Sequence, residues 1–338
     1  MTLIDARPTP LGLSRRHALK VFAATAALPI GVLGLRAIAP APQFHTWNGE
    51  VLGAVSSLTL WHGNAGFART TMLRMASEIG RLESIFSLYR PDSELRRLNT
   101  NGIVEGASRD LRAVMTGARN VGQATDGAFD PTVQPLWDVY ARHFSGPVAD
   151  PAGPSGFALE TARGLVDYRD IDTDGGAVRF ARPGMEATLN GIAQGYITDR
   201  IADLLQNEGF EHVVVELGEA RVLGDHPEGR PWRVALRDRA GATDRMVDLS
   251  SGAVALHGGY GTVFDESGRN HHIFDPATGQ SAQTMLDVAV VSDRATDADA
   301  IGVGIYVAGE ERAASILAQF PGTRAIITRL DGTTVTIG

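Results

Sequence analysis

Two adjacent histidines and a nearby aspartate are the first residues whose types and spacing could do chemistry, in the stretch HHIFDPATG at residues 271–279. Histidine is the usual proton acceptor near neutral pH. Pro276 and Gly279 would hold the turn so that a histidine base stands beside Asp275 as its charge partner. The alternative, favoured for this stretch by itself, is an exposed turn in which Asp275 binds its own backbone.

A second set of candidates opens the small-residue stretch DADAIGVGIYVAG at residues 297–309. Asp297 and Asp299 stand at the start of a predicted helix, where aspartates commonly cap backbone N–H groups. They could also bind Mg²⁺, which prefers one or two carboxylates together with substrate phosphates. The sequence therefore leaves helix capping and metal binding open here.

The stretch from Thr188 to Gly224 predicts the element that positions these groups: a glycine turn, a helix, a buried strand and another glycine turn. Gly191 and Gly195 flank the start of the helix, and a helix N-terminus after a glycine turn favours anions. Phosphate binding is thus one interpretation. The other is close helix packing that requires small residues.

Composition sets the limits on function. The chain has 338 residues, a net charge of -8, 43% hydrophobic residues and no cysteine. It is long enough for a large core, and the acidic balance argues against a general nucleic-acid partner. The lack of cysteine excludes disulfides and thiolate metal sites and agrees with an oxidising compartment.

The N-terminal residues 1–39 are predicted to be a targeting segment. Arg15 and Arg16 precede a moderately apolar run, residues 21–35, which is the pattern of a Tat signal peptide and predicts a periplasmic protein. Without cleavage the segment would remain as a membrane anchor. We expect residues 40–50 to be a linker and residues 51–338 to form the folded domain.

Hydrophobic periodicity predicts an α+β fold. Helical spacing covers residues 69–86, and strand-like runs include residues 51–61, 212–217, 232–237, 253–257 and 287–292. Residues 127–137 are expected to be a fixed loop and residues 138–154 an exposed excursion. Helices and strands mix without a strict βαβ rhythm, which argues against a doubly wound sheet.

Five motifs in order resemble the ApbE family of FAD:protein FMN transferases. They are SLYRPDSELRRLN, TDGAFDPTVQPLW, LNGIAQGYITD, HHIFDPATG and the DADA helix start. The resemblance covers residues 51–309, and the LNGIAQGY form with a Tat signal looks most like the NosX branch. It implies a mixed α/β fold with a central, largely antiparallel sheet, flanking helices and a flavin cleft between two lobes.

The resemblance also implies an activity. FAD would be bound with Mg²⁺, a threonine of an acceptor protein would attack the FMN-side phosphorus, and AMP would leave. The NosX likeness implies a NosR-type acceptor in nitrous oxide reductase maturation, and membrane association through that partner or an uncleaved signal. The matching positions are His272 as the catalytic base, Asp299 and the Ala193 carbonyl as metal ligands, and Tyr89, Asn99, Asp130, Gly191, Ala193, Gly195, His257 and Asp275 as cofactor-binding positions.

The chain departs from the family pattern at several of these motifs. Gln194 replaces a lysine, Glu219 a glycine, and His257 stands where the family has serine. Val303 replaces a metal-binding threonine and offers no oxygen. Two functions follow from the resemblance: a working transferase, or a non-catalytic flavin-binding assembly factor of the same fold.

Overall fold

The computed structural model describes residues 2–3, 41–146, 149–237, 241 and 245–338. The predicted signal motif around Arg15 and Arg16 lies outside these residues. Within the described ranges, none of the helices is both long and apolar enough to cross a membrane.

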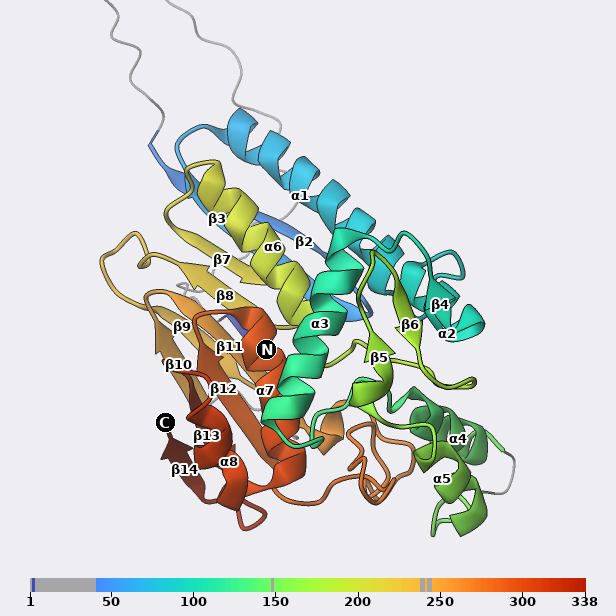
Figure 1. Cartoon of the computed structure of the whole chain (residues 1–338). Helices are drawn as coiled ribbons and strands as arrows, with labels where there is room; N and C mark the ends of the chain where they lie inside the picture. Colours follow the sequence, from blue (N-terminus) through green and yellow to red (C-terminus); the bar gives the residue numbers. More distant parts are fainter. Residues whose placement is uncertain (1, 4–40, 147–148, 238–240, 242–244) are drawn as a thin grey trace, which may run out of the picture.

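Helices and strands alternate irregularly along the chain (Figure 1). The helices are α1 (Ala65–Phe86), α2 (Glu94–Asn101), α3 (Arg109–Ala124), α4 (Gln134–Phe144), α5 (Gly156–Arg163), α6 (Ala193–Asn207), α7 (Ala295–Ala308) and α8 (Glu310–Leu317), with 3₁₀ turns η1 (Tyr168–Asp170) and η2 (Gly259–Gly261). The strands are β1 (Thr2–Leu3), β2 (Gln43–Val51), β3 (Ala54–His62), β4 (Ile103–Val104), β5 (Ile171–Asp172), β6 (Val178–Phe180), β7 (Val213–Glu216), β8 (Ala220–Leu223), β9 (Trp232–Leu236), β10 (Arg245–Leu249), β11 (Gly252–Gly258), β12 (Asp287–Ser292), β13 (Arg324–Thr328) and β14 (Thr334–Ile337).

The centre of the fold is an eight-stranded sheet in the order β14-β13-β12-β11-β8-β7-β3-β2, in which every neighbouring pair is antiparallel. One face is covered by α6 and α7, which lie side by side, with α3 next to α7 (Figure 1). The predicted α+β class with a largely antiparallel sheet is confirmed.

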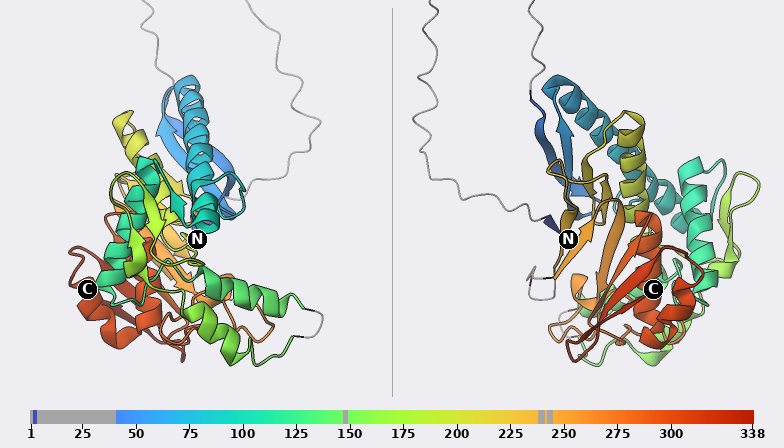
Figure 2. Two further views of the ribbon diagram at one scale, coloured as in Figure 1. Left: turned by 45° about the vertical axis from the view of Figure 1, so that its right-hand side comes forward. Right: turned by 90° about the vertical axis from the view of Figure 1, so that its left-hand side faces the viewer.

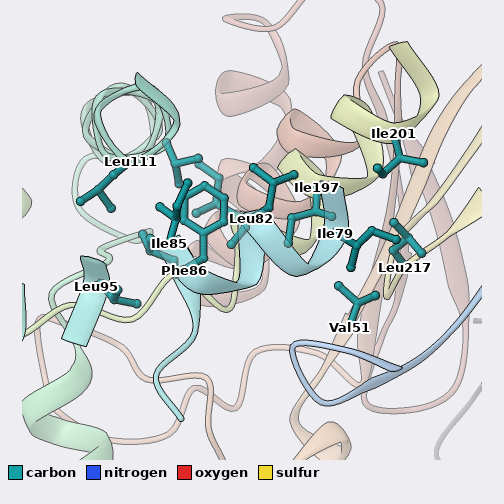
Figure 3. Close-up of a cluster of buried hydrophobic side chains, with 14 of the residues drawn as sticks. Val51, Ile79, Leu82, Ile85, Phe86, Leu95, Leu111, Ile197, Ile201 and Leu217 are labelled. Atoms are coloured by element: carbon teal, nitrogen blue, oxygen red, sulfur yellow. The ribbon is translucent and has the colours of Figure 1, made fainter. Parts of the chain in front are cut away.

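Apolar side chains on both faces of the sheet hold these layers together. The largest cluster joins α1, α3 and α6 to the sheet; it includes Val51, Ile79, Leu82, Ile197 and Leu217 (Figure 3). On the opposite face the β9–β10 hairpin packs through Trp232 and its neighbours. Figure 2 shows α4 and α5 projecting together from the rest of the fold.

The predicted linker at residues 40–50 is wrong for most of its length, because residues 43–51 form strand β2. The strand pairs with β3 over nine residues through a two-residue turn at Leu52 and Gly53. Both turn residues have positive φ, as the tight hairpin turn that suits twisted strands requires. Two prolines at positions 40 and 42 suggest a linker in the sequence, but they precede the strand.

The predicted exposed excursion at residues 138–154 is also wrong in its first part. Residues 134–144 form helix α4, which begins with Pro135 in its first turn. Proline is well tolerated there because its missing N–H has no helical partner in that position. Leu136 and Tyr140 bury the inner side of this helix against Phe274.

Candidate active site

A cavity of about 620 Å³ opens beside the start of α6 and the end of β11. Five of the predicted site residues line it: Tyr89, Asp130, Gly191, His257 and His272. A volume of this size is typical of small-molecule sites. The fold thus brings together residues that lie up to 183 positions apart in the chain.

His272 presents one free nitrogen in the wall of this cavity. Its Nδ1 lies 3.1 Å from the backbone carbonyl oxygen of Thr262. A carbonyl oxygen can only accept, so Nδ1 carries the proton and Nε2 keeps its lone pair. Burial lowers the pKa of His272 to about 4, with a smaller contribution from His271. The imidazole is therefore neutral at pH 7 and able to accept a proton.

The predicted pairing of a histidine base with Asp275 is wrong. The Asp275 carboxylate accepts hydrogen bonds from the Ala277 N–H and the Thr278 hydroxyl, both at 2.9 Å. His272 is oriented by the Thr262 carbonyl instead. The alternative of a turn that binds its own backbone describes this aspartate.

Asp130 lines the cavity and Asn99 does not, and both side chains bind backbone groups of neighbouring loops. Asp130 accepts hydrogen bonds from the Thr132 hydroxyl and from the Thr132 and Tyr168 backbone N–H groups. Burial raises its pKa to about 6. The Asn99 amide exchanges two hydrogen bonds with the backbone of Ala187, at 2.8 and 2.9 Å. Their predicted contacts with a flavin stay predictions.

Tyr89 is different, because its side chain is 76% exposed although it lines the cavity. An exposed aromatic ring at a cavity mouth offers an apolar face to a planar ligand. The predicted stacking of Tyr89 on a flavin stays a prediction.

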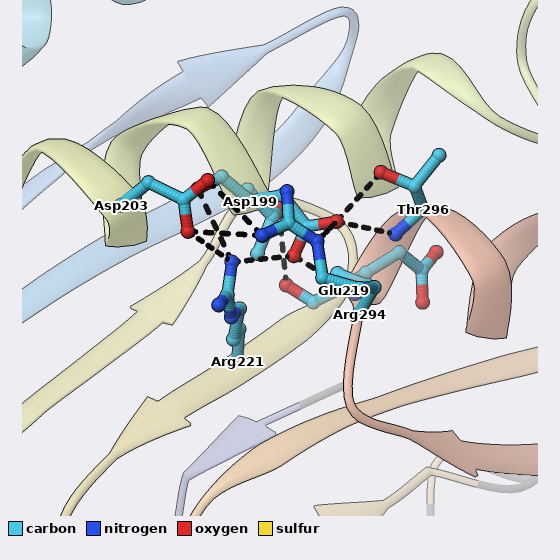
Figure 4. A network of polar contacts seen from close by, with 8 residues as sticks. Asp199, Asp203, Glu219, Arg221, Arg294 and Thr296 are labelled. Atoms are coloured by element: carbon cyan, nitrogen blue, oxygen red, sulfur yellow. Dashed lines mark hydrogen bonds and ion pairs between the residues drawn. The ribbon is translucent and has the colours of Figure 1, made fainter. Parts of the chain in front are cut away.

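Helices α6 and α7 cap each other. Asp199 of α6 accepts hydrogen bonds from the Ala295 and Thr296 backbone N–H groups at the start of α7, both at 2.9 Å. Asp299 of α7 accepts one at 3.0 Å from the Gly195 N–H at the start of α6. Figure 4 shows Asp199 held between these groups and two arginines. Asp299 therefore does cap a helix, but it caps the neighbouring one.

Gly195 is required by close packing. A Cβ at this position would lie 2.3 Å from the backbone oxygen of Ala295. The anion at the start of α6 is the Asp299 carboxylate. Gly191 lines the cavity against Phe129 and Val303, and Ala193 is the fully buried first residue of α6. Of the two interpretations, the packing interpretation accounts for Gly195.

The side chains of Glu219, His257 and Asp299 converge next to the cavity; Glu219 and Asp299 are buried and His257 is nearly so. Ligand atoms of Glu219, His257 and Asp299 all lie within 4.8 Å of one another. One atom on each, Glu219 Oε2, His257 Nε2 and Asp299 Oδ1, is buried without a hydrogen-bond partner. Glu219 lies in the turn between β7 and β8, His257 lies near the end of β11 and Asp299 lies in the second turn of α7. We call these residues the buried triad.

The triad is electrostatically unfavourable without a cation or a shared proton. Burial raises the pKa of Glu219 to about 7. Burial and the nearby charge of Glu219 raise the pKa of Asp299 above its ordinary range. Burial lowers the pKa of His257 to about 3, so this imidazole is neutral. Two carboxylates and a neutral nitrogen donor are a suitable environment for a divalent cation.

The predicted Mg²⁺ fits this donor set poorly. Val303 provides no oxygen, and His257 places a nitrogen beside Asp299, at 3.7 Å from its Oδ1. Mg²⁺ prefers oxygen ligands in octahedral geometry. The residues fit a divalent cation, but not one that selects oxygen alone.

Sequence reasoning did not assign Glu219 to the site. The sequence does contain an indication of this site, because Glu219 and His257 both place metal-ligand side chains where the ApbE pattern lacks them. They are 38 positions apart, so nothing in the sequence alone connects these two changes. The antiparallel pairing of β8 with β11 brings them together.

Comparisons with known proteins agree with one another. The ApbE family profile matches residues 52–327. The FAD:protein FMN transferase of Vibrio cholerae serotype O1 is 31% identical over 290 residues, covering 82% of this chain and 85% of that protein. The FAD:protein FMN transferase of Treponema pallidum is 29% identical over 273 residues, covering 72% of this chain and 73% of that protein.

Solved structures give the same result. The flavin transferase ApbE from Vibrio cholerae superimposes with a TM-score of 0.74 at 26% identity, covering 88% of this chain and 98% of that one. The ApbE protein from Thermotoga maritima gives a TM-score of 0.75 at 27% identity, covering 87% and 97%.

Proposed function

The chain belongs to the ApbE family, and we propose that it is a periplasmic FAD:protein FMN transferase that modifies a NosR-type flavoprotein during nitrous oxide reductase maturation. The family match over residues 52–327 supports the transferase class. The twin arginines Arg15 and Arg16 support export, and the LNGIAQGY form supports the NosR-type acceptor.

The observation that carries the proposal is the free Nε2 of His272 in the cavity wall. In the proposed reaction the hydroxyl oxygen of an acceptor threonine forms a bond to the FMN-side phosphorus of FAD. The bond from that phosphorus to the oxygen bridging to AMP breaks, and AMP leaves with that oxygen. The proton of the hydroxyl passes to His272 Nε2. Products and reactants balance as FMN-threonine and AMP against FAD and threonine.

The cavity supplies the other requirements of this reaction. Tyr89 at its mouth offers a face to the isoalloxazine ring, and Gly191 allows close approach of the ligand to the start of α6. None of the described residues that line it is a lysine or arginine. A positive charge near the phosphates would have to come from outside this lining, and Arg237 lines the adjoining pocket, which shares His257 and His272 with the cavity.

One observation favours the second function, a flavin-binding assembly factor without transfer. Val303 lines the cavity in place of a ligand oxygen, and Gln194 replaces a lysine that would meet phosphate. Both changes remove groups that could neutralise the phosphate charge of FAD, and neither changes the face that Tyr89 offers to the flavin ring. The two functions differ in whether AMP is formed.

The test is incubation of the purified mature chain with FAD, a divalent cation and a periplasmic fragment of NosR. A transferase gives flavin fluorescence on the fragment after denaturing electrophoresis, together with an equal amount of AMP. A fragment whose acceptor threonine is replaced by alanine is the control. FAD binding without labelling or AMP would support the assembly factor, and a chain that takes up no FAD would refute both functions.

Export is tested separately. Replacement of both arginines by lysine (R15K/R16K) should leave the protein in the cytoplasm, because the Tat route reads the arginine pair. Cell fractionation measures this. Periplasmic recovery of the double variant would contradict the proposed route.

A further inference from the structure

We propose that the buried triad of Glu219, His257 and Asp299 is a binding site for a borderline first-row transition cation of the Fe²⁺ to Zn²⁺ series, in preference to Mg²⁺. The proposal concerns this chain's own donor set. It does not require the transfer reaction, because binding is measured on the protein alone.

The geometry of the three donor atoms fits one metal ion. A metal with bonds of about 2.1 Å holds neighbouring ligand atoms about 3.0–3.6 Å apart for angles between 90° and 120°. His257 Nε2 and Asp299 Oδ1 are separated by 3.7 Å, and all three donors lie within 4.8 Å of one another. Small side-chain adjustments therefore suffice for a shared ion.

Each residue of the triad has one buried polar atom without a hydrogen-bond partner, and for the two carboxylates the other oxygen is already bound. The Glu219 carboxylate accepts a hydrogen bond from the Leu256 backbone N–H, which leaves Oε2 free. Asp299 Oδ2 accepts the Gly195 N–H, which leaves Oδ1 free. Asp299 is fully buried, and the His257 side chain is 10% exposed. Buried polar atoms without partners are rare in folded proteins and here all three converge.

Gly302 makes room for the nitrogen donor. It lies one turn after Asp299 on α7, and a Cβ there would stand 2.2 Å from His257 Cδ2 and 2.7 Å from Nε2. The edge of the imidazole ring that carries Nε2 therefore rests on the helix at a position that only glycine permits. Helix α7 therefore supplies Asp299 and also the surface against which the His257 ring packs.

The donor types decide which cation is preferred. Imidazole nitrogen is a common ligand of iron, nickel, copper and zinc, whereas Mg²⁺ selects oxygen and sheds its waters reluctantly. Val303 supplies no hydroxyl oxygen one turn beyond Asp299. The chain has thus exchanged an oxygen donor for a nitrogen donor and a second carboxylate. His257 also lines the cavity, so the triad lies directly beside it.

The experiment uses the full mature chain after chelation and dialysis. Calorimetric titration with Zn²⁺, Co²⁺ and Mg²⁺, without FAD or acceptor, measures binding directly. We expect one site that binds Zn²⁺ and Co²⁺ at least about tenfold more tightly than Mg²⁺, which is a difference of about 1.4 kcal/mol. Equal or tighter Mg²⁺ binding would overturn the proposal, as would the absence of any Zn²⁺ or Co²⁺ binding at millimolar ion.

A second measurement needs no substitution. In the Co²⁺-loaded wild-type protein, a metal-bound imidazole gives a hyperfine-shifted, exchangeable N–H proton signal in the NMR spectrum. Its presence is expected from His257, and its absence in a Co²⁺-bound protein would exclude nitrogen ligation. This result stands even if a variant fails to fold.

Variants then locate the site. His257→Ser and Glu219→Gln should each weaken Co²⁺ binding at least about tenfold, and Gly302→Ala should weaken it by displacing the ring without removing a donor. The control is His143→Gln, because His143 is half-buried on α4 and belongs neither to the triad nor to the cavity lining, and it should leave Co²⁺ binding unchanged. An equal loss in the control and in His257→Ser would show that histidines outside the triad bind the metal.

A double variant, His257→Ser with Val303→Thr, replaces the nitrogen donor by the oxygen donors of the family pattern. The ratio of Co²⁺ affinity to Mg²⁺ affinity should fall in this variant, or Mg²⁺ should bind more tightly. Retention of the wild-type preference would contradict the assignment of selectivity to these residues. Since none of these titrations includes FAD, a failed transferase assay leaves their outcome unaffected.

Discussion

At the scale of single residues, the site depends on how each side chain's second polar atom is used. His272 binds a backbone carbonyl through Nδ1, and this one contact fixes the tautomer and leaves Nε2 as an acceptor. One oxygen of Asp299 accepts a hydrogen bond from the α6 backbone, and the other has no hydrogen-bond partner. Each Asp275 oxygen accepts a hydrogen bond within its own turn, and the bond given for the His272 ring goes to the Thr262 carbonyl oxygen instead.

Replacement of His272 by alanine tests its role as the base. We expect transfer to fall by about 10²- to 10⁴-fold, the usual contribution of a general base. The dissociation constant for FAD should change little, because the flavin ring is expected at Tyr89. AMP formation and FAD fluorescence quenching measure the two effects. A parallel loss of FAD binding would make His272 a ligand contact instead.

The pH dependence of transfer follows from the same residue. Burial lowers the pKa of His272 to about 4, below its ordinary value. The neutral base form therefore persists at pH 5–8, and protonation of this base should lower kcat/KM only as the pH falls through about 4. Protonation also opposes folding, since between about pH 6.5 and pH 4 the unfolded chain binds more protons here. Rates should be measured where circular dichroism shows a folded protein; a midpoint near 6.5 would contradict a base whose pKa is lowered by burial.

At the scale of elements, the decisive arrangement is the pair of helices α6 and α7. Each supplies an aspartate that caps the start of the other, and Gly195 lets their backbones approach closely. The Asp199 carboxylate also pairs with Arg221 and Arg294, at 2.8 and 3.2 Å. The position of Asp299 is thus fixed by the same contacts that join the two helices.

A glycine comparison tests this packing. Gly195→Ala should lower the free energy of unfolding by about 1–3 kcal/mol, because its Cβ meets the backbone of Ala295, which cannot move as a side chain could. The matched control is Gly80→Ala in α1, where the Cβ would meet nothing within 4 Å. It should stabilise the protein by about 0.5–1 kcal/mol.

Denaturant unfolding measures both variants. If Gly195→Ala is as stable as the wild type, the close contact of α6 with α7 is not as tight as the structure shows.

At the scale of the whole molecule, the N-terminal hairpin completes the sheet. Strand β2 covers β3, and its Phe44 packs on Trp61, with ring centroids 4.6 Å apart, and on Trp232 at 6.1 Å. The hairpin therefore links the edge of the main sheet to the β9–β10 layer. The folded unit extends several residues further towards the N-terminus than the hydrophobic pattern indicates.

Truncation tests that boundary. A chain that starts at Val51 should melt at least about 6 °C below one that starts at Ala41, because lost burial of an aromatic residue costs about 3 kcal/mol and each kcal/mol corresponds to about 2 °C in a chain of this size. Exposure of β3 as a sheet edge should also promote aggregation. Equal melting temperatures would mean that β2 contributes nothing to stability.

The sequence by itself determined the fold class, the family and most of the elements. These depend on local patterns: helical spacing at residues 69–86, the β-branched run at residues 212–217, and ordered motifs such as HHIFDPATG. The roles predicted for His272 and Asp299 depend on the same ordered motifs. Gly209 has positive φ just after α6, as expected for a residue that ends a helix.

Only the tertiary structure decided which residues meet. The buried triad combines a turn, a strand end and a helix start, at positions 219, 257 and 299, and strand register and helix packing set the distances between them. Asp275 and His272 are three residues apart, yet Asp275 binds groups of its own turn and His272 binds the Thr262 carbonyl oxygen. Spacing along the chain predicts contacts within an element, because local geometry fixes them, whereas contacts between elements depend on packing that no local pattern records.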